Sequence, residues 1–335
     1  MGYAAEKREA DKQWKRWKKI TFFSVLFLLL GVIVFSIIVP PKTWKYYVDL
    51  PELTPRAEGQ MRAHFLDVGH SECIVIELPD GKTALIDGGD NREETEKTVL
   101  RYLNALDIDV IDYLVLTHAD ADHCGSLAAV VEHKEIGRAF LPLVSIDVND
   151  SFAKLYAEIM KEGCGFEYVA NGVSFSTNEY TFKAIHPFRF DLDSAIEAGE
   201  TWDESANAHS AVFWLEYEGV GTLLTSEISQ DTEELLLDSS ALGLFEDVDL
   251  SVMKILKVSH HGSNGSTSER LLTETQVETA IISCGENGYG HPTQAVLERL
   301  AAADVAVYRT DVNGSVIVSV NADESAYQVE TLGKE

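Results

Sequence analysis

The residues most able to do chemistry lie in the segment 117–126, which has the sequence THADADHCGS and follows an apolar run at 113–116. It contains four potential metal ligands within six residues: His118, Asp120, Asp122 and His123. Imidazole nitrogens and carboxylate oxygens are the donors that zinc, manganese and iron accept in proteins. A strand ending just before this segment would let the four side chains converge from one tight loop. The segment therefore predicts a metal site, in preference to an acidic, solvated turn.

A second group of chemically active residues is the pair His260 and His261, which follows the β-branched run 252–258. Two adjacent imidazoles before a Gly-Ser dipeptide are poor core material, although paired histidines can also be structural. The first histidine is expected at the end of a strand and the second in the following loop. We assign His260 as a metal ligand and His261 as a proton donor to a leaving oxygen.

Further motifs occur in a fixed order over roughly residues 60–320. They are FLDVGHSE (65–72), LIDGGD (85–90), H-x-D-x-D-H (118–123), LLTSE (223–227), LKVSHHGS (256–263), YGHPT (289–293) and YRTDVNGSV (308–316). Together they resemble the metallo-β-lactamase fold in the variant carried by ComEC-type competence proteins. The resemblance implies an α/β fold, a four-layer αββα sandwich, and a hydrolase with one or two divalent metal ions. Zinc is the first candidate and manganese the second.

The resemblance also implies a set of metal ligands, each matched to a position in this chain. The expected set is His118, Asp120, Asp122, His123, His209, Glu227 and His260. Asp120 stands where many members of the family have histidine, which would favour a harder ion such as manganese. Glu227 replaces an aspartate that usually bridges the metals, so bridging requires the backbone to retreat by about one bond length. His209 is either a compensating ligand or a surface residue.

The remaining roles are catalytic or supporting. Asp122 or Asp120 is expected to orient the attacking water, with His261 as the proton donor, and Asp122 and His261 are the predicted catalytic residues. Asp87, in the LIDGGD motif, would support the ligand loop through hydrogen bonds. Lys257 and His291 are weaker candidates for binding a substrate anion.

The elements that must position these residues alternate between strands and helices. Short apolar or β-branched runs predict strands at 61–68, 73–78, 83–86, 113–116, 138–143, 166–169, 174–175, 180–185, 211–217, 222–225, 252–258, 305–309 and 316–320. Helices are expected after a capping box at Asn91 and Glu94, from residue 127, at 151–161, after Ser266 and at 294–302. This pattern alone indicates a layered α/β domain with a mixed sheet, and the four-layer architecture rests on the resemblance.

The first sixty residues have a different composition from the remainder. We expect a basic cytoplasmic segment at 1–19, a transmembrane helix at 20–39, a linker at 40–59 and the hydrolase domain at 60–335. The apolar run Ile20 to Val39 has the length that spans a hydrocarbon core. Because basic residues precede it, the positive-inside rule places the C-terminal domain outside a single-pass plasma-membrane anchor. A cleavable signal peptide is the alternative, but no small-x-small site precedes the prolines at 40 and 41.

Charge constrains the substrate. The chain carries a net charge of −28, and residues 1–19 contribute +4, seven Lys or Arg against three Asp or Glu, which leaves −32 for the remainder. A body this acidic repels long polyanions, so duplex DNA is an unfavourable partner and a small or single-stranded phosphodiester is preferred. Residues 190–207 are expected to form an exposed acidic loop, either a solvated segment or a lid. The four cysteines show no CxxC pairing, and Cys124 is expected to be a buried thiol outside the site.

Three functions remain open on the sequence alone. The leading hypothesis is a membrane-anchored, extracytoplasmic metal-dependent hydrolase of phosphodiesters, nuclease-like or small, by metal-activated water. The second is a hydrolase of non-phosphate or wall-linked esters. The third is a non-catalytic binding module with a decayed metal site, for which Glu227 and the altered HSE turn at 70–72 would be the signs. Protein partners are not predictable from these motifs.

Overall fold

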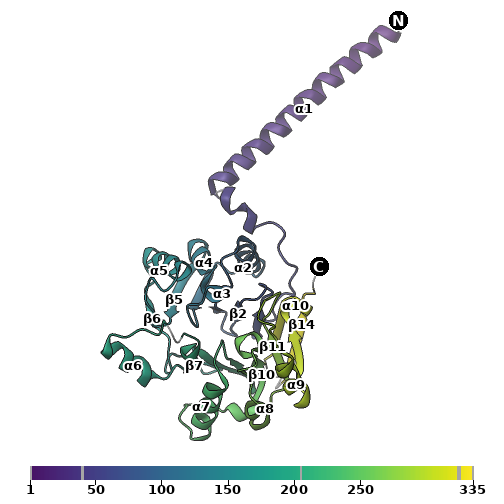
Figure 1. Ribbon diagram of the computed structural model, residues 1–335. Coiled ribbons are helices and arrows are strands. Elements are labelled where there is room, and N and C mark those ends of the chain that lie inside the picture. Colours follow the sequence, from purple (N-terminus) through teal and green to yellow (C-terminus); the bar gives the residue numbers. More distant parts are fainter. Residues whose placement is uncertain (1, 39–40, 204–205, 323–325, 334–335) are drawn as a thin grey trace. The chain divides into compact units, whose positions relative to one another are not determined.

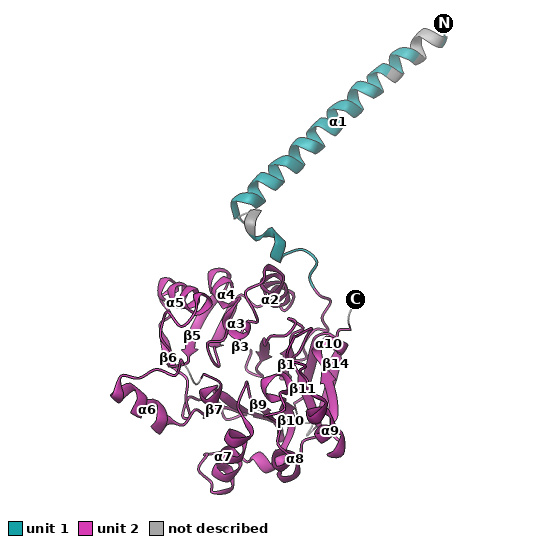
Figure 2. Ribbon diagram, in the orientation of Figure 1, with its two compact units in different colours: residues 1–50 teal, residues 51–335 magenta. Residues whose placement is uncertain are grey.

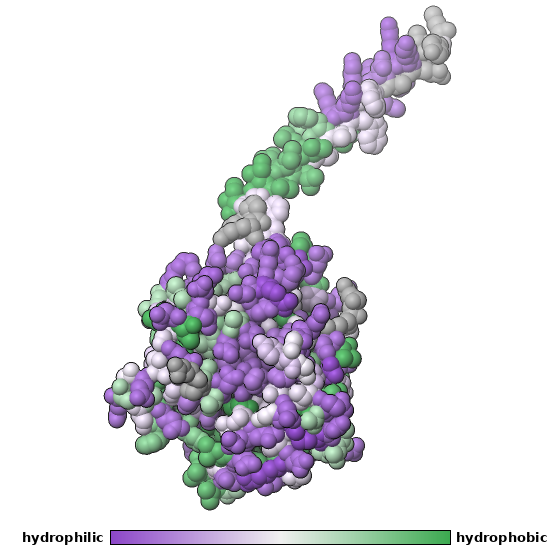
Figure 3. Space-filling view, viewed as in Figure 1, coloured by the Kyte–Doolittle hydropathy of each residue, from purple (hydrophilic) through white to green (hydrophobic). Residues whose placement is uncertain are grey.

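The computed structural model describes residues 2–38, 41–203, 206–322 and 326–333, and the chain divides into two units, residues 1–50 and 51–335 (Figure 2). The first unit consists of helix α1 (Gly2–Ile38) and the 3-10 helix η1 (Pro41–Tyr46). Within the described residues, α1 is the one helix long and apolar enough to cross a membrane. Figure 3 shows its hydrophobic stretch following a hydrophilic N-terminal part.

Helix α1 extends over both the basic segment and most of the apolar run that the sequence distinguishes. The predicted end of the membrane span, Val39, lies outside the described residues, and the predicted linker 40–59 includes η1.

The second unit contains two β-sheets (Figure 1). One has eight strands: β1 (Met61–Phe65), β2 (Ile74–Glu77), β3 (Thr83–Ile86), β4 (Val110–Val115), β5 (Glu135–Leu141), β6 (Phe166–Tyr168), β13 (Val316–Val320) and β14 (Tyr327–Thr331). The other has six: β7 (Tyr180–His186), β8 (Val212–Tyr217), β9 (Val220–Leu224), β10 (Met253–Lys257), β11 (Thr279–Ile282) and β12 (Ala306–Arg309). The strand orders are β14-β13-β1-β2-β3-β4-β5-β6 and β12-β11-β10-β9-β8-β7.

Helices cover the outer faces of both sheets. They are α2 (Glu93–Ala105), α3 (Ala121–Cys124), α4 (Leu127–His133), α5 (Asp150–Glu162), α6 (Arg189–Ala198), α7 (Gln230–Ala241), α8 (Glu269–Glu274), α9 (Gln294–Ala302) and α10 (Thr310–Asn313), with 3-10 turns η2 (Asn207–His209), η3 (Leu250–Val252) and η4 (Ser259–Gly262). In Figure 1, α2, α4 and α5 lie beyond the eight-stranded sheet, and α7, α8 and α9 lie beyond the six-stranded sheet. This arrangement is the predicted four-layer αββα sandwich.

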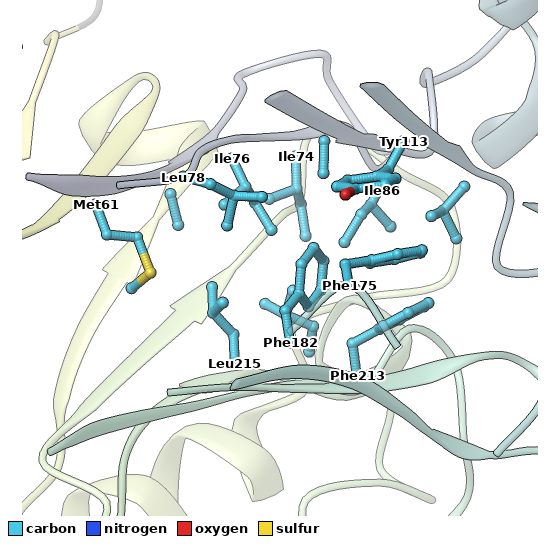
Figure 4. Packing of buried hydrophobic residues seen from close by; sticks show 14 of the residues in the cluster. Met61, Ile74, Ile76, Leu78, Ile86, Tyr113, Phe175, Phe182, Phe213 and Leu215 are labelled. Atoms are coloured by element: carbon cyan, nitrogen blue, oxygen red, sulfur yellow. The ribbon is translucent and has the colours of Figure 1, made fainter. Parts of the chain in front are cut away.

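The core between the sheets follows from the period-two alternation of side chains along each strand. In β1, Met61 points into this core, while in β8 Phe213 and Leu215 point into it from the other sheet (Figure 4). Trp214 faces the opposite way and packs in the second cluster, with side chains of α7, α8 and α9. Truncating a ring such as Phe213 to alanine would cost about 3 to 5 kcal/mol of stability.

Several local predictions need correction. Helix α2 begins at Glu93, and its N-cap residue Arg92 makes no side-chain capping bond, so the predicted capping box at Asn91 and Glu94 is absent. The predicted acidic loop 190–207 contains helix α6, because Leu192 and Ala195 bury themselves against Trp202.

The predictions for the second half of the chain were incomplete. The predicted strand at 174–175 is a single bridge between Ser174 and Lys183. Helix α7 and strands β11 and β14 had no predicted counterpart, although the sequence of β14, YQVET, alternates between half-buried and exposed residues.

Candidate metal centre

The loops that follow β3, β4, β9 and β10 meet and carry the candidate ligands. β3 is parallel to β4 in one sheet, and β9 is parallel to β10 in the other, so within each sheet the two carboxyl ends lie at the same edge. A hydrogen bond of 2.8 Å from the Ser226 hydroxyl to the Thr117 hydroxyl joins the two edges. Side chains that are far apart in sequence therefore converge on one centre.

Two groups of donor atoms form there, each with all its ligand atoms within 4.8 Å of one another. The first group is Asp122, His123, Glu227 and His261, and the second is His118, Asp120 and Glu227. The first group is nearly enclosed, whereas the second opens to solvent through Asp120, whose side chain is 50% exposed. All of these residues were predicted to belong to the site, although His261 was expected to act as a proton donor.

Glu227 belongs to both groups and turns one oxygen to each. Its Oε1 lies 3.3 Å from His123 Nε2 and 3.1 Å from His261 Nε2. Its Oε2 lies 3.4 Å from His118 Nε2 and accepts a hydrogen bond of 2.8 Å from the Asn207 side chain. The preceding residue, Ser226, has a left-handed backbone with φ of 48°. The longer glutamate side chain therefore reaches a position between the two groups.

The ring orientation of two histidines is fixed from behind. His123 Nδ1 lies 2.7 Å from the Asp87 carboxylate, and His261 Nδ1 lies 2.7 Å from the Ser283 carbonyl oxygen. Both partners are acceptors, so each ring donates from Nδ1 and keeps the lone pair of Nε2 for the centre. Asp87 also accepts from the Thr117 amide and hydroxyl, both at 2.8 Å, which is the supporting role expected for it.

Buried ring nitrogens without a hydrogen-bond partner test whether a cation fits this centre. Among the described side chains, His118 Nε2 and His261 Nε2 are such atoms. Leaving a buried polar atom unpaired costs about 1 to 3 kcal/mol, so native proteins seldom do it without a reason. Both atoms lie beside carboxylate oxygens in a set of imidazole and carboxylate donors, the chemistry of zinc, manganese and iron sites. The residues fit one or two divalent ions.

The carboxylates of the centre also favour positive charge beside them. Burial lowers the pKa of His123 and of His261, but the carboxylates around them outweigh burial: Asp87 and Glu227 raise the pKa of His123 well above its usual value, and Asp122 and Glu227 raise that of His261. Burial opposes ionisation of Asp122, yet the neighbouring imidazoles of His261 and His123 lower its pKa to about 2. The carboxylates therefore stay ionised and hold either protonated imidazoles or metal ions.

The paired histidines occupy different environments. The His261 side chain is 1% exposed and belongs to the first donor group, whereas that of His260 is 37% exposed, with Nε2 3.7 Å from Glu227 Oε2. Both residues have positive φ values, 49° for His260 and 52° for His261, a conformation that costs energy for side chains of this size. The geometry thus places His261, in the predicted role of His260, among the donors.

Three other predicted residues lie outside the donor groups. His209 stacks on Trp202 with ring centroids 4.3 Å apart. Lys257 is fully buried and donates to the Glu72 carboxylate across the two sheets, so it is not available to a substrate anion. His291 lies at the rim, 5.5 Å from the ring of His260.

Some residues of the centre and its rim were not predicted from the sequence. The Asn207 side chain donates a hydrogen bond to Glu227, and the Ser226 hydroxyl donates one to the Thr117 hydroxyl. Nothing in the NAHS and LLTSE segments indicated these hydrogen bonds. His70 lies 4.6 Å from the ring of His261, and its buried Nδ1 has no hydrogen-bond partner among the described side chains. The HSE turn, where the sequence departs from its family, therefore forms part of the site.

The comparisons with known proteins agree with this fold. Residues 66–286 match the metallo-beta-lactamase superfamily. Among curated proteins, the chain is 30% identical over 276 residues to ComE operon protein 3 of Bacillus subtilis, covering 78% of this chain and 33% of that protein. It is 27% identical over 267 residues to Recombination protein 2 of Haemophilus influenzae, covering 78% of this chain and 29% of that protein. The chain thus spans about a third of the length of these relatives.

Solved structures match this chain at low identity. The metallo-beta-lactamase fold protein YhfI from Bacillus subtilis matches with a TM-score of 0.47 and 10% identity, covering 78% of this chain and 100% of that one. On the family match over most of its second unit, this chain belongs to the metallo-beta-lactamase superfamily. Its homologues include competence-related proteins.

Proposed function

We propose that this chain is a membrane-anchored, extracytoplasmic hydrolase of phosphodiesters that uses one or two divalent metal ions, zinc first and manganese second. The observation that carries the proposal is the pair of donor groups that share Glu227. A decayed site would be expected to lose or pair its ligands. Here two ring nitrogens stay buried and unpaired beside ionised carboxylates, which supports a catalyst over a relic.

Each side chain of the centre has a definable task. When bound, divalent ions in such a site lower the pKa of a coordinated water and stabilise developing negative charge. His123, His261 and Asp122 would hold an ion in one donor group, His118 and Asp120 would hold an ion in the other, and Glu227 belongs to both groups. Asp120, half exposed, faces the solvent from which water and substrate arrive.

His260, in place of His261, would contact the substrate, as a hydrogen-bond donor and not as the proton donor predicted for His261. Its side chain is partly exposed at the mouth of the centre, 3.7 Å from Glu227. Burial lowers its pKa, so it meets a substrate as a neutral imidazole that donates one hydrogen bond. We assign it to the leaving or non-bridging oxygen of the substrate, and we keep Asp122 as the residue that binds and orients the reacting water.

The substrate we propose is a small or single-stranded phosphodiester. The competence and recombination names of the curated relatives favour nucleic acid. The acidic body disfavours duplex DNA, which needs several Lys or Arg contacts to bind usefully. Lys257 and Arg309, two basic residues near the motifs, are engaged with Glu72 and Asp311. Hydrolysis of non-phosphate esters is the second candidate, because the same donor set would serve it.

Metal content and turnover of one preparation test the enzyme assignment. The full chain in detergent, loaded with zinc or manganese, should hydrolyse a chromogenic phosphodiester and a single-stranded oligonucleotide faster than a duplex. Asp122→Ala should lose metal and activity together, whereas Asp193→Asn, an exposed carboxylate on α6, should keep both. Full metal occupancy in Asp122→Ala, or fastest cleavage of the duplex, would contradict the proposal.

The membrane assignment rests on α1 and on the seven basic residues that precede its apolar run. In that orientation the second unit lies outside the plasma membrane. Protease added to intact cells that express the chain should digest residues 51–335. A protected C-terminal body would overturn the orientation, and a mature chain that starts after Pro41 would overturn the anchor.

A further inference from the structure

Beside the metal centre, a row of aromatic rings leads outward to Tyr289. The ring of His70 lies 4.6 Å from that of His261, whose Nε2 belongs to the enclosed donor group. The ring of Tyr289 stacks on His70 at 5.8 Å and 28°, and on His291 at 5.8 Å and 30°. Tyr289 is therefore one ring removed from a metal-binding residue.

Tyr289 also presents a large free surface. It is 78% exposed, although a tyrosine ring is among the side chains with most to gain from burial. A single exposed ring is ordinary on a protein surface. This one differs because it ends a stack of rings that begins inside the catalytic centre.

The loop that carries Tyr289 is held in place. The Asn287 side-chain oxygen accepts hydrogen bonds from the Tyr289 amide at 3.0 Å and the His291 amide at 3.1 Å. Its side-chain nitrogen donates to the carbonyls of Gly285 at 2.8 Å and His291 at 2.6 Å. At Gly285 a Cβ would lie 2.5 Å from the backbone of Gly69, so the loop packs directly on the turn before His70. A fixed ring loses little conformational entropy when a ligand stacks on it.

We propose that Tyr289 is the stacking platform for an unpaired nucleobase of the substrate, next to the phosphodiester that is cleaved. This inference rests on the proposed phosphodiesterase function and specifies its substrate as single-stranded nucleic acid. Base–aromatic stacking tolerates any base, since every base has a π-face. In a duplex the faces of the bases are already stacked on one another, so a strand must be unpaired to use the platform.

Charge favours this mode of binding over phosphate contacts. The chain carries a net charge of −28, so a ligand held mainly through its phosphates meets repulsion over most of the surface. A neutral base on a neutral ring avoids that repulsion, and its contribution depends little on salt. Stacking on Tyr289 therefore contributes binding free energy that contacts to the sugar–phosphate backbone cannot supply against this repulsion.

The test measures binding and turnover of the metal-loaded full chain with two matched short single strands. One strand contains 2-aminopurine, whose fluorescence falls on stacking, and the other has abasic sites in place of the bases; both carry phosphorothioate linkages for the binding measurement. Tyr289→Leu removes the ring, and Tyr289→Phe keeps it. Phe190→Leu is the control, since Phe190 on α6 is equally exposed at 78%.

We expect Tyr289→Leu to weaken binding of the base-containing strand by about 5- to 150-fold, the range for loss of one base–aromatic stack, and to abolish the fluorescence quenching. Tyr289→Phe and Phe190→Leu should bind like the wild type, and the abasic strand should not distinguish the variants. Unchanged binding in Tyr289→Leu, or an equal loss with the abasic strand, would overturn the platform.

The two proposals fail separately. If the wild type cleaves single strands but Tyr289→Leu binds and cleaves them equally well, the phosphodiesterase stands and the platform falls. If the wild type cleaves no phosphodiester while the ring-dependent quenching persists, the base-binding site stands and the proposed hydrolysis falls. If the wild type shows neither cleavage nor quenching, both fall.

Discussion

Two buried clusters in the second unit combine a glutamate with histidine, and they differ in what completes them. In the first, Glu77 accepts from Arg62 at 2.7 Å, and both ring nitrogens of His64 have partners, Glu77 at 2.8 Å and the Tyr102 hydroxyl at 3.0 Å. Burial lowers the pKa of His64, so it is held neutral. The guanidinium supplies the positive charge, and this cluster is complete within the chain.

The second cluster, around Glu227, lacks such a partner. The three carboxylates of Asp87, Asp122 and Glu227 face imidazoles, and among the described side chains no lysine or arginine is paired with any of them. Two ring nitrogens there stay unpaired. A buried polar cluster is costly unless every member is satisfied. The Glu77 cluster therefore stabilises the fold by itself, whereas the Glu227 cluster requires bound cations to satisfy its polar groups.

The largest expected effect is the loss of metal in Glu227→Gln. Because one carboxylate oxygen faces each donor group, its removal should lower affinity at both by more than the about 10- to 100-fold typical of a supporting residue. Metal content after dialysis and turnover of a phosphodiester measure this loss. The metal-free variant should also be less stable than the metal-free wild type below neutral pH, because Glu227 raises the pKa of both buried imidazoles. If the variant retained its metal, the Glu227 cluster would not differ from the Glu77 cluster in the way described.

The matching variant in the other cluster, Glu77→Gln, should show the reverse. It leaves the Arg62 guanidinium buried without its charged partner, which costs about 3 kcal/mol. Thermal or denaturant unfolding of the metal-loaded protein measures the loss of stability. Metal content per folded molecule should remain that of the wild type. If Glu77→Gln lost metal while keeping its stability, the division between a structural and a cation-binding cluster would be wrong.

The ligand segment was predictable because its donors lie within six residues, so that any tight loop brings them together. The alternation of strands and helices also followed from the sequence pattern, whereas the four-layer sandwich and the supporting role of Asp87 followed from the resemblance to a known family. Helix α6 and the partners of Lys257 did not follow. Both depend on surfaces that meet only after folding: Trp202 against Leu192, and Glu72 against Lys257.

The placement of His261, and not His260, in a donor group has a similar cause. A strand prediction places alternate side chains on opposite faces, but both residues adopt left-handed backbone conformations beyond the end of β10. The direction of each ring is therefore set by local contacts, the Ser283 carbonyl for His261, and not by alternation. Sequence spacing identifies such a pair as chemically active without deciding which member faces the centre.

An intermediate effect is expected for Asp87→Asn, which touches no metal directly. Asparagine tolerates the left-handed backbone at this position, where φ is 58°, so the loop should keep its shape. Its amide nitrogen would face His123 Nδ1 and favour the tautomer with the proton on Nε2, the atom turned to the centre. Metal affinity should fall by about 10- to 100-fold, as for other residues behind a ligand. Competition with a fluorescent chelator measures it, and an unchanged affinity would show that Asp87 does not set the tautomer.

The smallest effect should come from pH, because no side chain is removed. In the metal-free protein, neighbouring carboxylates raise the pKa of His123 and His261 against the effect of burial. Groups with a raised folded pKa contribute stability that is fully present below the unfolded value, about 6.5, and is lost as pH rises through the folded value. The metal-free protein should therefore become less stable as pH rises above neutrality.

The metal-loaded protein should show the opposite slope over the same range, because metal binding requires neutral imidazoles and strengthens as protons leave. Unfolding temperatures with metal and with a chelator, measured between about pH 6 and pH 9, compare the two forms. Glu77→Gln, which leaves the centre intact, should keep both slopes. Glu227→Gln should flatten the metal-free slope, since it removes a carboxylate that raises both imidazole pKa values. Parallel slopes in the two wild-type forms would mean that protons and metal do not compete for these histidines, and the centre would then differ from the Glu77 cluster only in its exposure.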